Sequence, residues 1–496
     1  MENLAGLLTD AAQAHAARPA LLIGDTRIPY RELDAARVRW TGLLRARGLR
    51  PGDRVAIVLP NGFEYIGALY GTLSAGGIAV PLNPLLRRAE IEERLADSDA
   101  SILVAPAAAE ELAGLPVART DASEALIATP DNGIAERGGD EPAILLYTSG
   151  TTGRPKGAEL THGGMRASAA FLSGPLLRLR DDDVLLGAAP FSHIFGLAGV
   201  LNPAIATGAC IALLPRFDAE AALALMQRES AEVFLGVPSM CIALLRAADA
   251  GAPVPKLRVA HVGGAPLPPE TLHAFAARFG CEVLEGFGMT ETSGGVVSHV
   301  SGQLVKPGSV GTPAPGVDLR IAGAGGEDLG AGEPGEVQLR APGMMRGYWR
   351  DPGATREAFA DGWFRTGDVG YRDADGYLYL VDRTKDVIMR GGYSVYPREV
   401  EDALYEHPAV SEAAVVGVPD ELLGEEVVAV VVPRAGHDCD PVEIRAFMRE
   451  RVAAYKYPRL VVVAAGLPHG PSGKILKREI DRVPLREALD AGSPAG

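Results

Sequence analysis

The chain has 496 residues, 47% of them hydrophobic, and its 48 Lys and Arg against 63 Asp and Glu give a formal charge of −15. This length exceeds what one hydrophobic core organises, so two or three domains are expected. The acidic surplus disfavours nucleic acid and anionic membranes as partners, and an anionic substrate would need locally placed cations.

The N-terminal stretch, residues 1–22, has the pattern of an amphipathic helix. It carries Glu2 and Asp10 and no basic segment of the kind that opens a signal peptide. The sequence has no run of 18 apolar residues, so no membrane-spanning helix is expected. Four cysteines without C-x-x-C spacing are typical of buried thiols in a reducing compartment. We therefore expect a soluble, cytoplasmic protein.

Further along the chain, short apolar runs alternate with segments of helical period such as 218–229 and 268–280. This alternation predicts α/β architecture with largely parallel, buried strands. The predicted strands are RVAIVLP at 54–60, GIAVPLN at 77–83, SILVAP at 101–106, DVLLGAAP at 183–190, CIALLP at 210–215, VFLGVPS at 233–239, RVAHVGG at 258–264 and EVLEGFG at 282–288.

The sequence pattern changes after about residue 310. Residues 310–383 are rich in Gly and Pro turns between short strands, which predicts an antiparallel, barrel-like piece. The remaining residues show two helices, near 397–407 and 440–452, and two Val-rich strands, which predicts a small α+β domain. We expect a large N-terminal domain over 1–383 and a small domain over 384–496.

The stretch YTSGTTGRPKG at 147–157 favours phosphate binding, because it combines glycines, hydroxyls and Lys156. It is not a P-loop: counting from Gly150, the second glycine of G-x-x-x-x-G-K-[ST] falls on Pro155, and Gly157 stands where that motif needs a hydroxyl. Neither GFGMTE nor GAGGED completes a dinucleotide-binding G-x-G-x-x-G. An ordinary polar turn is the alternative.

This stretch resembles the phosphate loop of the superfamily of acyl-CoA synthetases, nonribosomal-peptide adenylation domains and firefly luciferase, and further motifs in the same order extend the resemblance over most of the chain. The resemblance implies phosphate contacts from Thr148, Ser149, Gly150, Thr151, Thr152, Gly153 and Lys156.

GFGMTET at 286–292 resembles the adenine and magnesium motif of that superfamily. The resemblance implies that Phe287 lies against the adenine, with Gly286 and Gly288 beside it, that Thr290 contacts the α-phosphate, and that Glu291 binds Mg²⁺ with Thr148 nearby. The strip at Gly263, Gly264 and Ala265 would lie along the other adenine face.

Three further motifs complete the implied site. Asp368 and Arg383 match the ribose-binding pair, and Lys474 in PSGKILKRE matches the lysine of the adenylation step. PFSHIFG would place His193 and Phe195 at the carboxylate and acyl chain. Each residue alone would more often be a surface charge or a structural histidine.

The chemistry implied is the activation of a carboxylic acid by ATP. The carboxylate attacks the α-phosphate, pyrophosphate leaves, and a thiol displaces AMP from the acyl-adenylate. Charge collects at the α-phosphate, where Lys474 and Mg²⁺ are expected. In relatives the small domain then rotates about a hinge, matched here by Lys385, and brings in a glycine loop matched by Gly391, Gly392 and Tyr393.

The thiol is expected to be coenzyme A, because GGYSVYPREVE resembles CoA ligases more than peptide-synthetase domains. The acid is expected to be a medium- or long-chain fatty acid. PFSHIFGLAG has no acidic residue to pair with an amino acid, and Gly286 replaces the arginine of malonate-activating relatives. An aryl acid is the runner-up. A stand-alone ligase that loads a carrier protein and a non-catalytic nucleotide-binding regulator are further alternatives. No nucleic acid or integral membrane partner is expected.

We predict that Gly286→Arg abolishes most activity on neutral acids, because a guanidinium at the floor of the acyl pocket would meet no partner. The measurement is kcat/KM on the best acid. An unchanged value would show that residue 286 does not border the acyl group.

We predict that Lys474→Ala slows adenylate formation about 10²–10³-fold, the usual cost of losing one charge-stabilising donor. Thioester formation from synthetic acyl-adenylate and CoA should continue at close to the wild-type rate. Lys385→Pro should do the reverse, since a fixed φ hinders rotation at the hinge. Equal loss of both half-reactions in a folded Lys474→Ala protein would contradict the domain-alternation scheme.

Overall fold

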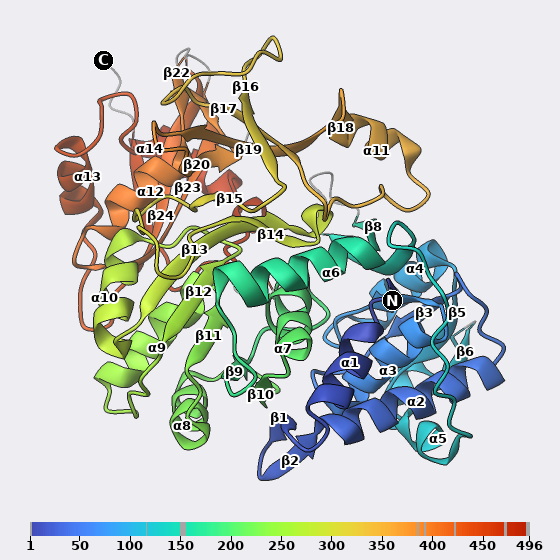
Figure 1. Ribbon diagram of the computed structural model, residues 1–496. Helices are drawn as coiled ribbons and strands as arrows, with labels where there is room; N and C mark the ends of the chain where they lie inside the picture. The colour runs from blue at the N-terminus through green and yellow to red at the C-terminus, as the bar shows by residue number, and fades with distance from the viewer. Residues whose placement is uncertain are drawn as a thin grey trace.

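The computed structural model describes residues 2–115, 117–148, 155–383, 386–390, 393–420, 423–470 and 474–492. Four β-sheets and the helices packed on them make up this part of the chain (Figure 1). No helix within it has the length and apolar character needed to cross a lipid bilayer. The mixed α/β fold class expected from the sequence is confirmed.

The first sheet has six strands in the order β6-β5-β3-β4-β7-β8 and is parallel except for β8. Successive strand residues face opposite sides, and α2 and α3 pack on one face while α4 packs on the other. The elements are β3 (Arg54–Ile57), β4 (Ile78–Pro81), β5 (Ala100–Val104), β6 (Ala118–Thr120), β7 (Pro142–Thr148), β8 (Lys156–Thr161), α2 (Tyr30–Ala46), α3 (Phe63–Ser74), α4 (Arg88–Ser98), η1 (Glu110–Leu112) and α5 (Ala122–Ile127).

The second sheet has nine strands in the order β15-β14-β13-β12-β11-β9-β10-β1-β2, parallel from β1 to β13. Helices α8, α9 and α10 cover one face, and α1 and α7 lie on the other. The strands are β1 (Pro19–Ile23), β2 (Thr26–Pro29), β9 (Val184–Gly187), β10 (Cys210–Leu213), β11 (Val233–Gly236), β12 (Val259–Gly263), β13 (Glu282–Met289), β14 (Gly294–Ser298) and β15 (Thr312–Pro313).

Two helices of this layer, α8 and α10, cover the segments of helical period expected at 218–229 and 268–280. The carboxylate of Asp218 accepts from the N–H of Ala221 at the start of α8, and Gly280 ends α10 with a φ of 64°. The helices are α1 (Gly6–Ala14), α6 (His162–Phe171), η2 (Leu172–Leu176), η3 (Phe195–Leu201), α7 (Asn202–Thr207), α8 (Ala219–Glu229), α9 (Pro238–Asp249), α10 (Pro269–Phe279) and η4 (Thr290–Thr292).

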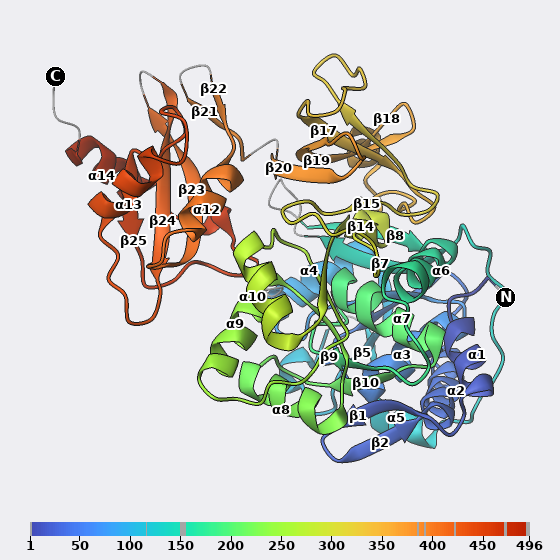
Figure 2. The same ribbon diagram turned by 60° about the vertical axis from the view of Figure 1, so that its left-hand side comes forward.

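The third sheet is the antiparallel piece expected over 310–383, and it follows the order β16-β17-β19-β18 with β20 paired to β19. It lies above the parallel sheets in the view of Figure 2. Its elements are β16 (Asp318–Ala322), β17 (Gly335–Arg340), β18 (Phe359–Ala360), β19 (Trp363–Arg372), β20 (Leu378–Arg383) and α11 (Pro352–Ala358).

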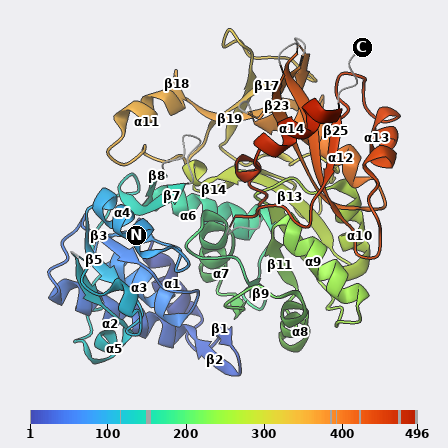
Figure 3. The same ribbon diagram turned by 180° about the vertical axis from the view of Figure 1, so that it is seen from behind.

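The C-terminal elements form a separate lobe around a fourth sheet (Figure 2). Helices α12 and α13 pack on one face of this sheet, and α14 packs on the other face. Figure 3, which views the molecule from behind, shows α14 in front of the sheet. The elements are β21 (Ile388–Arg390), β22 (Tyr393–Val395), β23 (Val410–Asp420), β24 (Gly424–Pro433), β25 (Leu460–Val463), α12 (Pro397–Tyr405), α13 (Pro441–Arg449), η5 (Lys477–Glu479) and α14 (Val483–Gly492). The boundary at residue 383 stays a prediction.

The segment around 147–157 departs from expectation. The sequence places it between a strand and a helix, whereas the structure has a β-hairpin: β8 pairs antiparallel with β7, Thr148 lies opposite Lys156, and α6 begins only after β8. The short strand KGAELT buries Ala158 and Leu160 against the core. Its glycine and charged residues hide that pattern in the sequence.

Candidate active site

Residues from two distant motifs meet around Tyr348. Its hydroxyl donates to Glu291 Oε1 at 2.8 Å, and Lys156 Nζ lies 5.3 Å from the centre of its ring. Glu291 is only 6% exposed, so this hydrogen bond stabilises a carboxylate that water barely reaches. Burial, followed by the negative charge of Glu291, raises the pKa of Tyr348 well above its usual value, and the phenol stays a neutral donor at physiological pH.

Backbone pairing holds this cluster together. The N–H of Trp349 donates to the carbonyl of Gly157 at 2.7 Å, so the segment before α11 runs along β8. The N–H of Met345 donates to the carbonyl of Glu291, also at 2.7 Å. Thr148, at the end of β7, contacts the carbonyl of Lys156 through its hydroxyl at 3.4 Å. Tyr348 was not predicted as a site residue, because the sequence indicates only short strands and turns in this part of the chain.

The glycine-rich ends of β12 and β13 form the second part of the site. Gly263 lies beside Gly286 in the parallel register, and a Cβ on Gly263 would come within 3.2 Å of the Gly286 carbonyl oxygen. A Cβ on Gly288 would overlap the Gly294 carbonyl of β14. Gly264 turns the chain away with a φ of 80°. The half-buried residues Ala265, Phe287 and Thr290 border the strip.

The third part joins the PFSHIFG motif to the C-terminal lobe. The N–H of Phe195 donates to His193 Nδ1 at 3.2 Å, which leaves Nε2 to carry the proton of a neutral ring. Desolvation by the surrounding protein lowers the pKa of His193, and the charge of Lys474 lowers it further. Part of the His193 side chain is nevertheless exposed to solvent. Lys474 therefore lies close enough to act electrostatically on His193. The N–H of Gly470 donates to the Lys474 carbonyl at 2.8 Å and anchors this stretch.

The predicted ribose pair lies on neighbouring strands. Asp368 of β19 is opposite Arg383 of β20 in the antiparallel register, and the Asp368 side chain is 7% exposed. For Arg383 and Tyr393 only the backbone is described. The other predicted residues at Ser149, Gly150, Thr151, Thr152, Gly153, Lys385, Gly391 and Gly392 lie outside the described residues.

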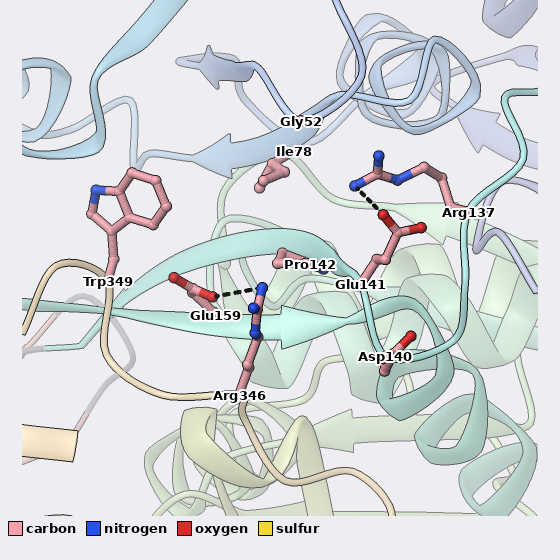
Figure 4. A pocket seen from close by; sticks show the side chains of 9 residues that line it. All are labelled: Gly52, Ile78, Arg137, Asp140, Glu141, Pro142, Glu159, Arg346 and Trp349. Atoms are coloured by element: carbon pink, nitrogen blue, oxygen red, sulfur yellow. Dashed lines mark ion pairs between the residues drawn. The ribbon is translucent and has the colours of Figure 1, made fainter. Parts of the chain in front are cut away.

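A cavity of about 400 Å³ lies on the opposite face of the hairpin, between two ion pairs (Figure 4). Arg137 pairs with Glu141 at 3.1 Å, and Arg346 with Glu159 at 3.9 Å. Glu159 is three residues from Lys156 on β8, so the two side chains face opposite sides of the strand. This cavity contains none of the predicted site residues and is distinct from the Tyr348 cluster.

Comparison with known proteins places this arrangement in a family. Residues 8–349 match the family described as AMP-binding enzyme, and residues 399–474 match the AMP-binding enzyme C-terminal domain. The chain belongs to the AMP-binding enzyme family. It is an ATP-dependent acyl-CoA ligase, which confirms the enzyme class expected from the sequence, and its substrates are a carboxylic acid, ATP and coenzyme A.

Similar family members differ in the acid they are named for. The chain is 40% identical to a feruloyl-CoA synthase from an Amycolatopsis species, over 92% of this chain and 94% of that one. It is 32% identical to a long-chain-fatty-acid–CoA ligase of Bacillus subtilis, over 97% and 94%. The crystal structure of ATP-bound MatB from Rhodopseudomonas palustris superposes with a TM-score of 0.90 at 33% identity, covering 98% of each chain.

We predict that Tyr348→Phe weakens the site at Glu291. A hydrogen bond to a charged group contributes about 1.5–3 kcal/mol, so adenylate formation should fall roughly 10- to 100-fold and need more Mg²⁺ for half-maximal rate. Pyrophosphate exchange measured across Mg²⁺ concentrations reports both effects. Tyr377→Phe is the matched control, because its hydroxyl donates to the carbonyl of Leu304, in the loop between β14 and β15. If both variants behave alike, the Tyr348 bond has no particular part in the reaction.

Proposed function

We propose that this enzyme converts an aromatic carboxylic acid to its CoA thioester through an acyl-adenylate. The aromatic acid was the runner-up from sequence, and the surroundings of Gly286 favour it over a fatty acid. The fatty-acid expectation remains untested, since the family includes ligases named for both classes.

The supporting observation is the arrangement of rings and glycines at the acyl end. Phe195 stacks on His261 with 6.3 Å between ring centres and 12° between planes. The backbone of Gly263 and Gly286 lies against this pair of rings. A Cβ added to Gly263 would be 3.3 Å from Phe195 Cε2, and one added to Gly286 would be 2.5 Å from His261 Nε2. Flat glycine backbone beside a stacked ring pair accommodates another planar ring in offset or edge contact.

The polar atoms nearest to Gly286 are uncharged. A Cβ on Gly286 would lie 2.5 Å from His261 Nε2 and 3.0 Å from Ser298 Oγ. Burial lowers the pKa of His261 to about 4, so its imidazole is neutral at physiological pH. An acid with a second anionic group would find no charge partner in these two side chains.

We assign the nucleotide to the glycine strips and the Tyr348 cluster. Phe287 lies against the adenine, Asp368 accepts from the ribose hydroxyls, and Lys156 and Thr290 hold phosphate oxygens. His193 and Lys474 lie at the substrate carboxylate, where Lys474 stabilises the charge that develops on the α-phosphate. The charge of Lys474 helps to lower the pKa of His193, after the larger effect of desolvation, and this influence supports the assignment.

We propose Glu291, with Thr148, as the residues that hold Mg²⁺. Among the described residues no group of three or more His, Cys, Asp and Glu side chains is gathered for a metal ion. A single buried carboxylate fits Mg²⁺, which nucleotide enzymes bind through one or two carboxylates and substrate phosphates. Held there, Mg²⁺ would neutralise charge on the departing pyrophosphate.

The test is a survey of CoA-dependent AMP formation with fatty acids from butyrate to palmitate and with benzoates and cinnamates. We expect the best aromatic acid to exceed every fatty acid at least tenfold in kcat/KM, a difference of about 1.4 kcal/mol. A fatty acid as the best substrate would overturn the aromatic assignment. Adenylate formation without transfer to CoA would instead favour the carrier-protein alternative.

A further inference from the structure

A buried carboxylate of the large domain faces a cation of the C-terminal lobe. Glu285, on β13 immediately before Gly286, is 2% exposed, and its Oε2 has no hydrogen-bond partner within the described part of the chain. Desolvation raises the pKa of Glu285 to about 7, and the positive charge of Arg398 is the largest influence that lowers it. Burying a carboxylate is costly unless a partner compensates its charge.

Arg398 is the second residue of α12 and is 8% exposed, which is unusual for an arginine. Its Nη1 donates to the carbonyl of Leu380 at 2.8 Å, a hydrogen bond from the C-terminal lobe to β20 of the large domain. Its Nε lies 3.7 Å from Asp402 on the next turn of α12. Its charge also lowers the pKa of Tyr371 on β19, against the larger effect of burial. The guanidinium thus bonds to β20 and acts electrostatically on side chains of β13 and β19.

We propose that Arg398 is a positioning residue that holds the C-terminal lobe in the arrangement that places Lys474 at His193. The proposal rests on the two-step function above and adds to it the contact that favours one lobe position. When the lobe leaves, Glu285 loses its cation and Leu380 loses its donor. Both losses oppose departure, so the contact stabilises the adenylation arrangement specifically.

Holding the C-terminal lobe near Glu285 also affects the acyl site, which lies one residue further along β13. The positive charge of Arg398 acts on Glu285, and the next residue along β13 is Gly286 of the acyl site. If the C-terminal lobe is fixed relative to β13, Lys474 also keeps a fixed position relative to Gly286. Rate depends steeply on such placement, because misplacing a catalytic group by about 1 Å can cost about 10²-fold.

The experiment compares half-reactions in Arg398→Gln and Glu285→Gln, each made in the full-length enzyme and assayed with the acid that the wild type uses best. Pyrophosphate exchange should fall about tenfold in each variant. Thioester formation from synthetic acyl-adenylate and CoA should be unchanged or faster, since that step needs the other lobe position. The double variant should lose little more than either single one, because the two side chains act as a pair.

Two controls separate this effect from general damage. Arg451→Gln removes an exposed ion pair with Glu406 inside the same lobe, 3.1 Å long, and should leave both half-reactions intact. Arg398→Lys, which keeps the charge, should recover part of the adenylation rate. Equal loss of both half-reactions, or no loss in Arg398→Gln, would overturn the proposal. Lys474→Ala is run alongside: if it fails to separate the half-reactions, the two-step alternation itself is wrong, whereas a split in Lys474→Ala alone rejects only the role of Arg398.

Discussion

The hydrogen bond from Tyr348 to Glu291 is the interaction on which the nucleotide end of this site depends. It joins the turn η4 after β13 to the segment before α11, and that segment in turn pairs with β8 of the hairpin. Glu291 is nearly inaccessible, so without a donor its carboxylate would be a destabilising buried charge. The phenol donates this hydrogen bond without adding a charge of its own. One neutral donor therefore serves both stability and chemistry.

The glycine strips, which we assign to the adenine and the neighbouring acyl group, follow a different physical rule, which is the exclusion of side chains. Gly263, Gly286 and Gly288 lie where neighbouring backbone and rings leave no room for a Cβ. The overall charge is −15, yet the substrates are anionic, so the few cations near the site carry unusual weight. Lys156 comes from the hairpin and Lys474 from the other lobe. The arrangement of lobes, and not only the folding of one domain, therefore decides how much positive charge the site contains.

Much of the fold could be predicted from sequence, since buried parallel strands are continuous apolar runs and all eight runs coincide with strands. The end of α10 at Gly280 followed from local chemistry alone. The strand β8 could not be predicted, because KGAELT is short and mixed, and only its pairing with β7 makes it a strand. Tyr348, His261 and Ser298 escaped for the same reason: their importance comes from contacts across the fold, which no local pattern records. The roles of residues in the phosphate loop and at the hinge stay predictions.

The crowding at Gly286 also constrains how the acid specificity can evolve. A side chain at 286 cannot be added by one substitution while His261 holds its ring 2.5 Å from the Cβ position. A smaller residue at 261 alone would open a void beside Phe195 and loosen the stacked pair. Each step is unfavourable in isolation and tolerable only with the other, so the two positions are epistatic. Members of this family that differ at 286 should differ at 261 as well, and a change of acid class would pass through paired replacements on neighbouring strands.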